Sequence, residues 1–343
     1  MAAAKKIRVL IVDDSLVFRE VLRKGLSSDP AIEVVAVAVD PFDARDKILR
    51  YQPDVMTSDV EMPKMNGIEF IRRLLPQYAL PVVVVSSVNA AVFDAMKVGA
   101  VDFVAKPDLS SVGNVETFLR ELIRAVKIAA QAKVMTAEAV RVDRTVALKA
   151  AGAKITSRIV AIGASTGGTE AIYRVLRDLP SDMPGIVIVQ HIPPVFSRMF
   201  ADRLDKAVPL EVKEAEDGDR LEPGRVLIAP GDRHVRVRKI GDSYKVECFQ
   251  GDKVNGHCPS VDVLFDSIAK EAGNRAVGVI LTGMGYDGAK GLLAMRRKGA
   301  RTIGQDEGSS VVYGMPKAAY EIGAVEKQAR LSDIAQALLS TLD

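Results

Sequence analysis

The sequence contains little cysteine, no tryptophan and no long apolar run. Only Cys248 and Cys258 are present among 343 residues, which argues against a disulfide framework and indicates a reducing compartment. The apolar run from Ile7 to Val12 ends in two aspartates and is too short for a signal-peptide core or a membrane span. We therefore expect a cytoplasmic protein that does not insert directly into a membrane.

A large excess of charge of one sign is also absent. The formal net charge is +3, so the composition does not favour nucleic acid or an anionic membrane as the main partner. The chain is 48% hydrophobic and 27% charged, which is typical of a folded globular protein. A prior of roughly 150 residues per domain predicts two domains, each with its own core.

Residues 1–110 alternate short β-branched runs with helical patterns. The runs are Ile7 to Val12, Glu33 to Ala38, Asp54 to Ser58, Val82 to Val85 and Val101 to Val104. Continuous apolar runs of this length are typical of strands that helices cover on both faces. The pattern predicts five βα units in a flavodoxin-like α/β domain, whose ligands bind at the carboxyl edge of a parallel sheet.

Charged and hydroxyl side chains directly follow these runs: Asp13, Asp14, Asp59, Ser86 and Lys106. Three carboxylates at one edge repel each other unless a hard divalent cation lies among them, and oxygen ligands favour Mg²⁺. Asp59 could then accept a phosphoryl group as a carboxylate nucleophile, with Lys106 and Ser86 contacting the new oxygens. The alternative is that these acids are solvated loop residues and helix caps.

The segments around these residues resemble response regulator receiver domains. They are Val-Asp-Asp-Ser, Ser-Asp-Val-Glu-Met-Pro-Lys-Met-Asn-Gly, Val-Ser-Ser and Phe-Val-Ala-Lys-Pro, and the match covers residues 5–125. The resemblance implies that Asp59 is the phosphoacceptor and that Asp13, Asp14 and the backbone of Glu61 hold Mg²⁺ with it. It also implies that Phe103 is a switch aromatic, whose side-chain rotamer changes together with that of Ser86. Plain core packing is an equally good interpretation of Phe103.

A connector follows this domain. From Glu121 to Lys154 the strand pattern is lost and the sequence becomes Ala-rich and basic, which is typical of a helix running into a linker. A basic stripe could bind an acidic partner, but on an Ala-rich helix it is usually a solvated face. We expect a receiver domain over 1–125, a linker over 126–154 and a catalytic domain over 155–343.

A serine lies at a strand-to-helix turn in the second half. The run Ile159 to Ile162 is followed by Gly-Ala-Ser-Thr-Gly-Gly, which places Ser165 in a G-x-S-x-G pattern. Flanking glycines permit a tight turn that aims backbone N–H groups and a helix N-terminus at a developing oxyanion. A phosphate-binding loop stays open as an alternative, although the G-x-G-x-x-G spacing and the P-loop lysine are missing.

A serine nucleophile needs a base, and the chain has three histidines. His191 is favoured because it follows the run Ile186 to Gln190, the next strand of the same βαβ unit. His234 begins an alternating, half-exposed strand pattern. His257 lies in a loop beside Cys258. Because adjacent side chains rarely face each other, the sequence does not favour a catalytic His257–Cys258 pair. A pocket-lining, surface or structural role is expected for both histidines.

The orienting carboxylate should also follow a strand. Val277 to Leu281 precedes Thr-Gly-Met-Gly-Tyr-Asp-Gly, so Asp287 is the best candidate to fix the tautomer of His191. Asp306 and Asp262 are the competing acids. The chain order Ser, His, Asp differs from that of the α/β-hydrolase fold, which indicates a different scaffold. We expect a doubly wound, mostly parallel, Rossmann-like hydrolase domain.

Several longer segments resemble the chemotaxis protein-glutamate methylesterases, the CheB family, over nearly the whole chain. They are Ala-Ile-Gly-Ala-Ser-Thr-Gly-Gly-Thr-Glu-Ala, Gln-His-Ile-Pro-Pro, Lys-Glu-Ala-Glu-Asp-Gly, Ile-Ala-Pro-Gly-Asp-Arg-His and Gly-Val-Ile-Leu-Thr-Gly-Met-Gly-Tyr-Asp-Gly. In this resemblance Ser165, His191 and Asp287 match the catalytic triad. The backbone around Thr166 and Met284 helps to bind the oxyanion, while their side chains are open to a purely structural interpretation.

The resemblance also implies what the protein does. It implies a phosphorylation-activated serine esterase that hydrolyses glutamyl methyl esters, and deamidates glutamines, on the cytoplasmic domains of chemoreceptors. The phosphodonor is a chemotaxis histidine kinase, and the receiver covers the hydrolase until it is phosphorylated. We expect a monomer, with no cofactor for the ester reaction. Cys258 stands where the family more often has arginine.

Two other classes of function compete with this interpretation. The second half could be a non-catalytic binding module or a DNA-binding output domain. Against DNA binding, it shows no obvious basic recognition helix or set of stacking aromatics. Labelling of Ser165 by an organophosphonate distinguishes a catalyst from a binding module.

Overall fold

The computed structural model describes residues 5–87, 89–107, 112–134 and 158–342. The contacts divide the chain into two compact units, Met1–Asp143 and Arg144–Asp343. Most of the linker expected over 126–154 lies outside the described residues, although residues up to Ala129 still belong to a helix. Within the described residues, no helix is long and apolar enough to cross a membrane.

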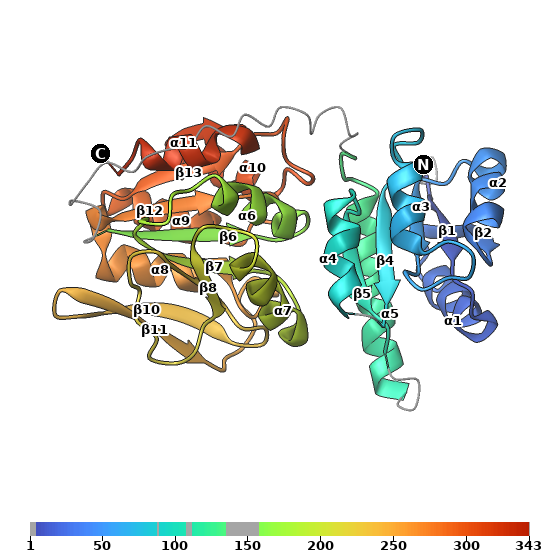
Figure 1. The fold of residues 1–343 in the computed structure, drawn as a ribbon, viewed down its shortest axis with the longest axis horizontal. Helices are drawn as coiled ribbons and strands as arrows, with labels where there is room; N and C mark the ends of the chain where they lie inside the picture. The colour runs from blue at the N-terminus through green and yellow to red at the C-terminus, as the bar shows by residue number, and fades with distance from the viewer. Residues whose placement is uncertain (1–4, 88, 108–111, 135–157, 343) are drawn as a thin grey trace. The chain divides into compact units, whose positions relative to one another are not determined.

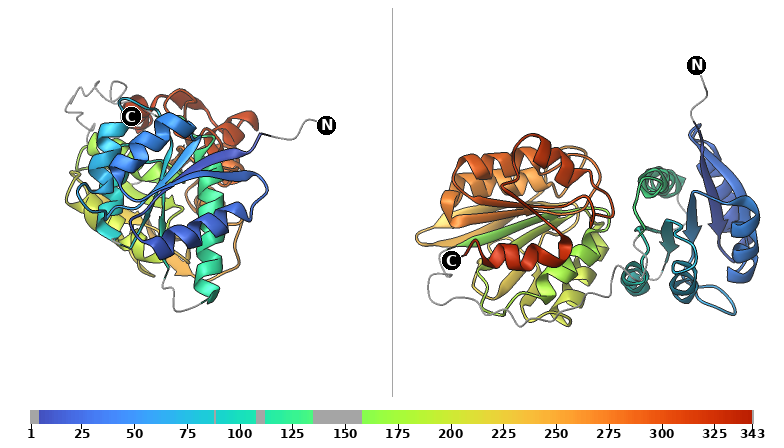
Figure 2. Two further views of the ribbon diagram at one scale, coloured as in Figure 1. Left: turned by 90° about the vertical axis from the view of Figure 1, so that its right-hand side faces the viewer. Right: turned by 90° about the horizontal axis from the view of Figure 1, so that it is seen from above.

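The N-terminal unit is a five-stranded parallel sheet between helices (Figures 1 and 2). Its strand order is β2-β1-β3-β4-β5, which is the expected flavodoxin-like order. Its elements are β1 (Ile7–Val12), α1 (Leu16–Ser27), β2 (Ile32–Ala38), α2 (Pro41–Tyr51), β3 (Val55–Ser58), α3 (Gly67–Leu74), β4 (Val82–Ser86), α4 (Asn89–Lys97), β5 (Asp102–Ala105) and α5 (Val112–Ala129). The five apolar runs in the sequence thus correspond to the five strands.

Local chemistry explains where the first helices begin. The side chain of Ser15 accepts from the N–H of Phe18, and the side chain of Asp40 accepts from the N–H groups at the start of α2. Asn66 caps α3 in the same way through the N–H of Glu69. Because β1 and β4 are buried on both faces over most of their length, their side chains are almost all aliphatic.

The C-terminal unit is built on a seven-stranded sheet in the order β14-β13-β12-β6-β7-β9-β8, and every recorded strand pair in it is parallel. Its elements are β6 (Ile159–Ala164), α6 (Gly168–Arg177), β7 (Gly185–Gln190), α7 (Pro194–Asp205), β8 (Glu211–Glu214), β9 (Arg225–Ile228), β10 (His234–Ile240), β11 (Ser243–Phe249), α8 (Val261–Glu271), β12 (Ala276–Ile280), α9 (Ala289–Arg297), β13 (Arg301–Gln305), α10 (Met315–Glu321), β14 (Lys327–Ala329) and α11 (Ile334–Leu339). Strands β10 and β11 form a separate antiparallel hairpin.

The order of this sheet defines one switch point. From β6 the chain builds outward through β7 and β9 on one side, and later through β12 and β13 on the other. In open α/β sheets, ligands bind beyond the carboxyl ends of the strands at such a reversal. The loops after β6 and β12 therefore mark the place where this domain is expected to do its chemistry. The predicted fold class is confirmed in both units.

Candidate functional site

Ser165 lies in the turn between β6 and α6, where both main-chain polar groups are hydrogen-bonded. Its N–H donates to the carbonyl of Thr282 at 3.0 Å, and its carbonyl accepts from the N–H of Gly168 at 2.7 Å and from Gln190 Nε2 at 2.9 Å. Gly167 has a φ of +76°, a left-handed conformation that favours glycine and lets α6 begin at the next residue. Ser165 stands at the N-terminus of this helix, and the residue is only 8% exposed.

His191 and Asp287 meet beside this turn. Strands β6 and β7 pair with Ala164 opposite Gln190, so Ser165 and His191 leave neighbouring strands at the same level. His191 Nε2 lies 2.9 Å from Asp287 Oδ2. The other ring nitrogen, Nδ1, is buried and has no hydrogen-bond partner among the described residues, and no hydrogen bond joins it to Ser165 there. Nδ1 is thus the nitrogen left to accept a proton.

Asp287 accepts hydrogen bonds from the N-terminus of α8. Its donors are Ser260 Oγ at 2.8 Å, the N–H groups of Val261 at 2.7 Å and Asp262 at 3.2 Å, and Asn255 Nδ2 at 2.8 Å. Burial opposes ionisation of this carboxyl, but the bond from His191, followed by those from Asn255 and Val261, holds the pKa of Asp287 well below its usual range. A stably ionised carboxylate against Nε2 is what an orienting acid requires.

Of the two competing acids, Asp262 lies beside Asp287, to which Asn255 joins it, and Asp306 follows β13. Asp262 accepts from the N–H of Gly291 and from Asn255, and burial raises its pKa. Asp306 accepts from the N–H and the hydroxyl of Ser309. Neither carboxylate contacts a histidine in the part of the chain that the structure describes, so the geometry favours Asp287 as the partner of His191.

The other two histidines have different surroundings. His234 begins β10, and the residue is only 2% exposed. Its Nε2 contacts the carbonyl of Asp252 at 2.9 Å, and its Nδ1 accepts from the N–H of Ser260 at 3.2 Å. These bonds indicate a structural role. The ring of His257 stacks on that of His191, with centroids 3.7 Å apart and planes inclined by 5°. Burial raises the pKa of Cys258, which argues against a reactive thiolate next to His257.

The loop after β12 supplies candidate oxyanion donors. A Cβ on Gly283 would lie 2.7 Å from Ser165 Cβ, so this loop passes directly beside the serine. In the described part of the chain, the N–H of the next residue, Met284, donates to no acceptor. Thr282 Oγ1 donates to the carbonyl of Thr166 at 3.0 Å and so ties the two loops together. Thr166 is 5% exposed and Met284 is half-buried.

Several residues of the site do not follow a strand, and sequence reasoning missed them. Asn255 and Ser260 donate to Asp287, although both lie in the loop that leads to α8. Gln190 bridges the carbonyls of Ser165 and His191. A sequence signal existed for two of them: Asn255-Gly256 is typical of a tight turn, and Ser260 precedes an apolar helical pattern as an N-cap residue does.

Gly163 packs against the helix that holds Asp287. A Cβ at this position would lie 2.2 Å from Val261 Cγ1. We predict that Gly163→Ala destabilises the C-terminal domain by about 1–3 kcal/mol, because the side chain of Val261 must move out of its packed position. Urea unfolding followed by far-UV circular dichroism measures this loss. Gly113→Ala is the comparison, since nothing lies within 4 Å of a Cβ there, and we expect a change below about 1 kcal/mol. Equal effects of the two substitutions would contradict the packing argument.

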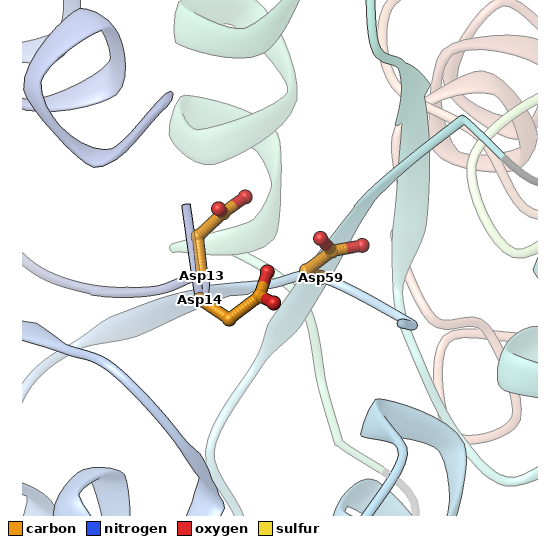
Figure 3. A group of neighbouring side chains, drawn as sticks. All are labelled: Asp13, Asp14 and Asp59. Carbon is orange, nitrogen blue, oxygen red and sulfur yellow. The ribbon is translucent and has the colours of Figure 1, made fainter. Parts of the chain in front are cut away.

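A second cluster lies at the carboxyl edge of the N-terminal sheet. Carboxylate oxygens of Asp13, Asp14 and Asp59 all lie within 4.8 Å of one another (Figure 3). Asp13 and Asp59 are buried, and Asp14 is exposed. Lys106 Nζ contacts Asp59 Oδ2 at 2.5 Å and Asp13 Oδ2 at 2.8 Å. Four of the residues predicted at the strand ends are therefore brought together.

The charges of this cluster leave room for a cation. Burial and the neighbouring Asp59 raise the pKa of Asp13 above its usual range, and the opposing effect of Lys106 does not cancel this. One ammonium group thus faces three carboxylates. A donor set made only of oxygen atoms suits a hard divalent cation. The cluster is consistent with a metal site.

The remaining predicted receiver residues lie on the neighbouring strands. Ser86 ends β4, is fully buried and pairs with Ala105, and its carbonyl accepts from the N–H of Lys106. Phe103 on β5 is half-buried and packs edge-on against Phe93, with ring centroids 6.2 Å apart. Asp59 Oδ1 accepts from the N–H of Glu61, whose side chain is exposed. The switch roles of these residues stay predictions.

Comparisons with known proteins match both halves of the chain. A family model described as CheB methylesterase matches residues 160–338, and one described as response regulator receiver domain matches residues 9–112. The crystal structure of the CheB methylesterase catalytic domain of Thermotoga maritima is similar to the second half. It has a TM-score of 0.52 and 39% sequence identity, and the match covers 53% of this chain and 97% of that one.

Full-length relatives are similar along the whole chain. A protein-glutamate methylesterase/protein-glutamine glutaminase of Syntrophomonas wolfei is 57% identical over 340 residues, which cover 99% of this chain and 98% of that protein. A protein of the same name from Escherichia coli strain 536 is 47% identical over 341 residues, covering 98% and 97%.

Proposed function

The chain belongs to the CheB methylesterase family and carries a response regulator receiver domain, and from this premise we propose that Ser165, His191 and Asp287 catalyse its reaction. The protein is a protein-glutamate methylesterase and protein-glutamine glutaminase of chemotaxis adaptation. The observation that carries the assignment of residues is the 2.9 Å contact between His191 Nε2 and Asp287 Oδ2, beside the Ser165 turn.

The proposed reaction begins with attack of Ser165 Oγ on the side-chain carbonyl of a glutamyl methyl ester. His191 Nδ1 takes the hydroxyl proton, and Asp287 stabilises the imidazolium that forms. The N–H of Met284 and the backbone around Thr166 receive the oxyanion. Because catalytic hydrogen bonds are often long or absent without substrate, we expect the bond between Ser165 and His191 to form when the ester binds.

Collapse of the tetrahedral intermediate releases methanol, which leaves with the proton from His191. Water then attacks the acyl-enzyme, again with His191 as base, and glutamate and free Ser165 are formed. With glutamine as substrate the same steps release ammonia instead of methanol. The ester reaction needs no cofactor in this scheme. Incubation with methyl-labelled receptor cytoplasmic domain and measurement of released methanol tests the proposed reaction. A protein that releases no methanol would contradict it.

For the receiver we propose that Asp13, Asp14, Asp59 and the backbone carbonyl of Glu61 bind Mg²⁺. The support is the close set of carboxylate oxygens at the carboxyl edge of the sheet. When bound, the cation neutralises charge on a phosphoryl group as it transfers. Asp59 accepts that group from a chemotaxis histidine kinase, and Lys106 and Ser86 bind its oxygens. The side-chain rotamer of Phe103 then changes together with that of Ser86.

Phosphorylation is proposed to release the catalytic domain from inhibition by the receiver. A phosphoryl group adds close to two negative charges, which can shift a marginal domain interface. We therefore predict that a small-molecule phosphodonor with Mg²⁺ raises methanol release of the full chain by about 5- to 150-fold, the usual range of allosteric coupling. Chelation of Mg²⁺ should abolish the increase.

Asp59→Asn should remove this stimulation, because an amide cannot accept the phosphoryl group. Asp46→Asn is the matched control, since Asp46 is an exposed acid paired with Arg45, and it should respond like the wild type. Equal rates with and without phosphodonor in the wild type would contradict regulation by the receiver. Undiminished stimulation of Asp59→Asn would contradict the choice of phosphoacceptor.

The finer assignments of partners and boundaries are also proposals. We propose the cytoplasmic domains of methylated chemoreceptors as substrates, and a monomer that acts in the cytoplasm without binding nucleic acid or inserting into the membrane. The domain limits stay as expected from the sequence, with a receiver over 1–125, a linker over 126–154 and a catalytic domain over 155–343.

A further inference from the structure

A tight turn lies between the hairpin β10–β11 and helix α8. Val254 and His257 exchange two backbone hydrogen bonds of 3.0 Å, and the two residues between them, Asn255 and Gly256, have φ values of +54° and +82°. Two central residues with positive φ define a type I′ turn, for which Asn-Gly is the preferred sequence. We call residues 254–257 the Asn-Gly turn.

Asn255 joins the two buried carboxylates of the site. Its Nδ2 donates to Asp287 Oδ1 at 2.8 Å and to Asp262 Oδ2 at 2.7 Å. A side-chain amide has two N–H bonds, and both are used here, whereas a hydroxyl has only one. Asn255 and Ser260 both donate to Oδ1 of Asp287. These two bonds orient the carboxylate so that Oδ2 faces His191.

His257 acts on the other member of the pair. Its ring covers one face of the His191 imidazole, nearly parallel and with centroids 3.7 Å apart. The hydrogen bond from Nε2 to Asp287 fixes one nitrogen of His191 but still allows the ring to tilt. A planar group stacked on the face removes that freedom, and it also keeps water from that side of the ring.

The far end of the same loop is anchored in the domain core. His234 accepts from the N–H of Ser260 through Nδ1 and contacts the carbonyl of Asp252 through Nε2. Ser260 Oγ in turn donates to Asp287. The Asn-Gly turn is therefore connected to fixed groups on both sides, which is what a positioning element needs.

We propose that the Asn-Gly turn is a positioning clamp for the general base, in which Asn255 orients Asp287 and His257 holds the ring plane of His191. The proposal rests on the proposed function, because it needs His191 to act as the base. Since Nδ1 of His191 has no partner among the described residues, the ring is aligned in that part of the chain at Nε2, by Asp287, and on its face, by His257. The clamp supplies that alignment, and misplacement of a catalytic group by about 1 Å can cost about 100-fold in rate.

The first arm of the test removes the amide without straining the turn. Asn255→Gly suits the positive φ of this position and deletes only the side chain. We expect kcat for methanol release from methylated receptor to fall about 10- to 100-fold, with KM within about twofold of the wild type. Asn255→Ala, which keeps a Cβ but also lacks the amide, should lose at least as much.

The second arm separates stacking from mere presence of a side chain. His257→Ala should lower kcat about 10-fold or more, while His257→Phe, which restores a flat ring, should recover most of the rate. Ile240→Ala is the control, because it truncates an exposed aliphatic side chain at the end of β10, outside the Asn-Gly turn. It should leave kcat unchanged.

All rates are measured on the full chain and divided by the amount of Ser165 that an organophosphonate labels at completion, so partly folded variants remain informative. Wild type without activity, or an active Ser165→Ala protein, means that the proposed function has failed, not the clamp. With an active wild type, kcat within twofold for both Asn255→Gly and His257→Ala overturns the clamp. A loss in only one arm, or no recovery in His257→Phe, contradicts the claim that both side chains position the pair.

Discussion

Ser165→Ala is expected to lower methanol release from methylated receptor by at least about 10⁴-fold. Without the hydroxyl no acyl-enzyme can form, and only substrate binding and the oxyanion donors remain to assist water. Stability should change little, because Ser165 Oγ makes no hydrogen bond among the described residues. Far-UV circular dichroism and thermal unfolding check the fold, and radiolabelled methanol measures the rate.

The matched control for this substitution is Ser332→Ala. Ser332 is exposed, and among the described residues its hydroxyl bonds to the neighbouring Asp333 alone. Its removal should leave both methanol release and phosphonate labelling unchanged. A Ser165→Ala protein that retains a tenth of the wild-type rate would show that another group is the nucleophile.

Asp287→Asn is expected to reduce kcat by about 10⁴-fold, close to the effect known for the orienting acid of serine hydrolases. Both oxygens of Asp287 accept hydrogen bonds, so an amide must turn its NH₂ group toward a donor. If the NH₂ group faces His191, the ring must present its other tautomer, and Nδ1 then carries a proton and cannot take one from Ser165. Steady-state kinetics on methylated receptor measures the loss.

Asp306→Asn distinguishes this account from the competing assignment of the acid. Asp306 Oδ1 accepts from Ser309, and asparagine can keep that oxygen in place. We expect Asp306→Asn to retain kcat within about twofold. If Asp306→Asn lost activity and Asp287→Asn kept it, the assignment of the orienting acid would have to be reversed.

The strand ends are the part of both sites that the sequence predicts well. In a parallel sheet all carboxyl ends lie on one edge, so residues that follow apolar runs must come together there. This places Asp13, Asp59 and Lys106 in contact in one unit. The same rule brings His191 and Asp287 together in the other unit, although the pair is distant in the chain.

The residues that support the catalytic pair could not be predicted in this way. Asn255, His257 and Ser260 lie in a loop whose path depends on how the hairpin β10–β11 packs, and no periodic pattern encodes that path. His234 shows the same limit: the alternation after it predicts a half-exposed strand, but the residue is buried and its ring nitrogens contact backbone groups of Asp252 and Ser260. Strand periodicity locates an element, whereas loop contacts depend on tertiary packing.

The most direct test of the central claim is a crystal structure of the full chain after reaction with an organophosphonate. Our account predicts phosphorus bonded to Ser165 Oγ, a phosphonyl oxygen facing the N–H of Met284, and His191 Nδ1 within about 2.6–3.2 Å of Oγ. An adduct on a different residue, or an imidazole at position 191 turned away from the modified serine, would contradict it.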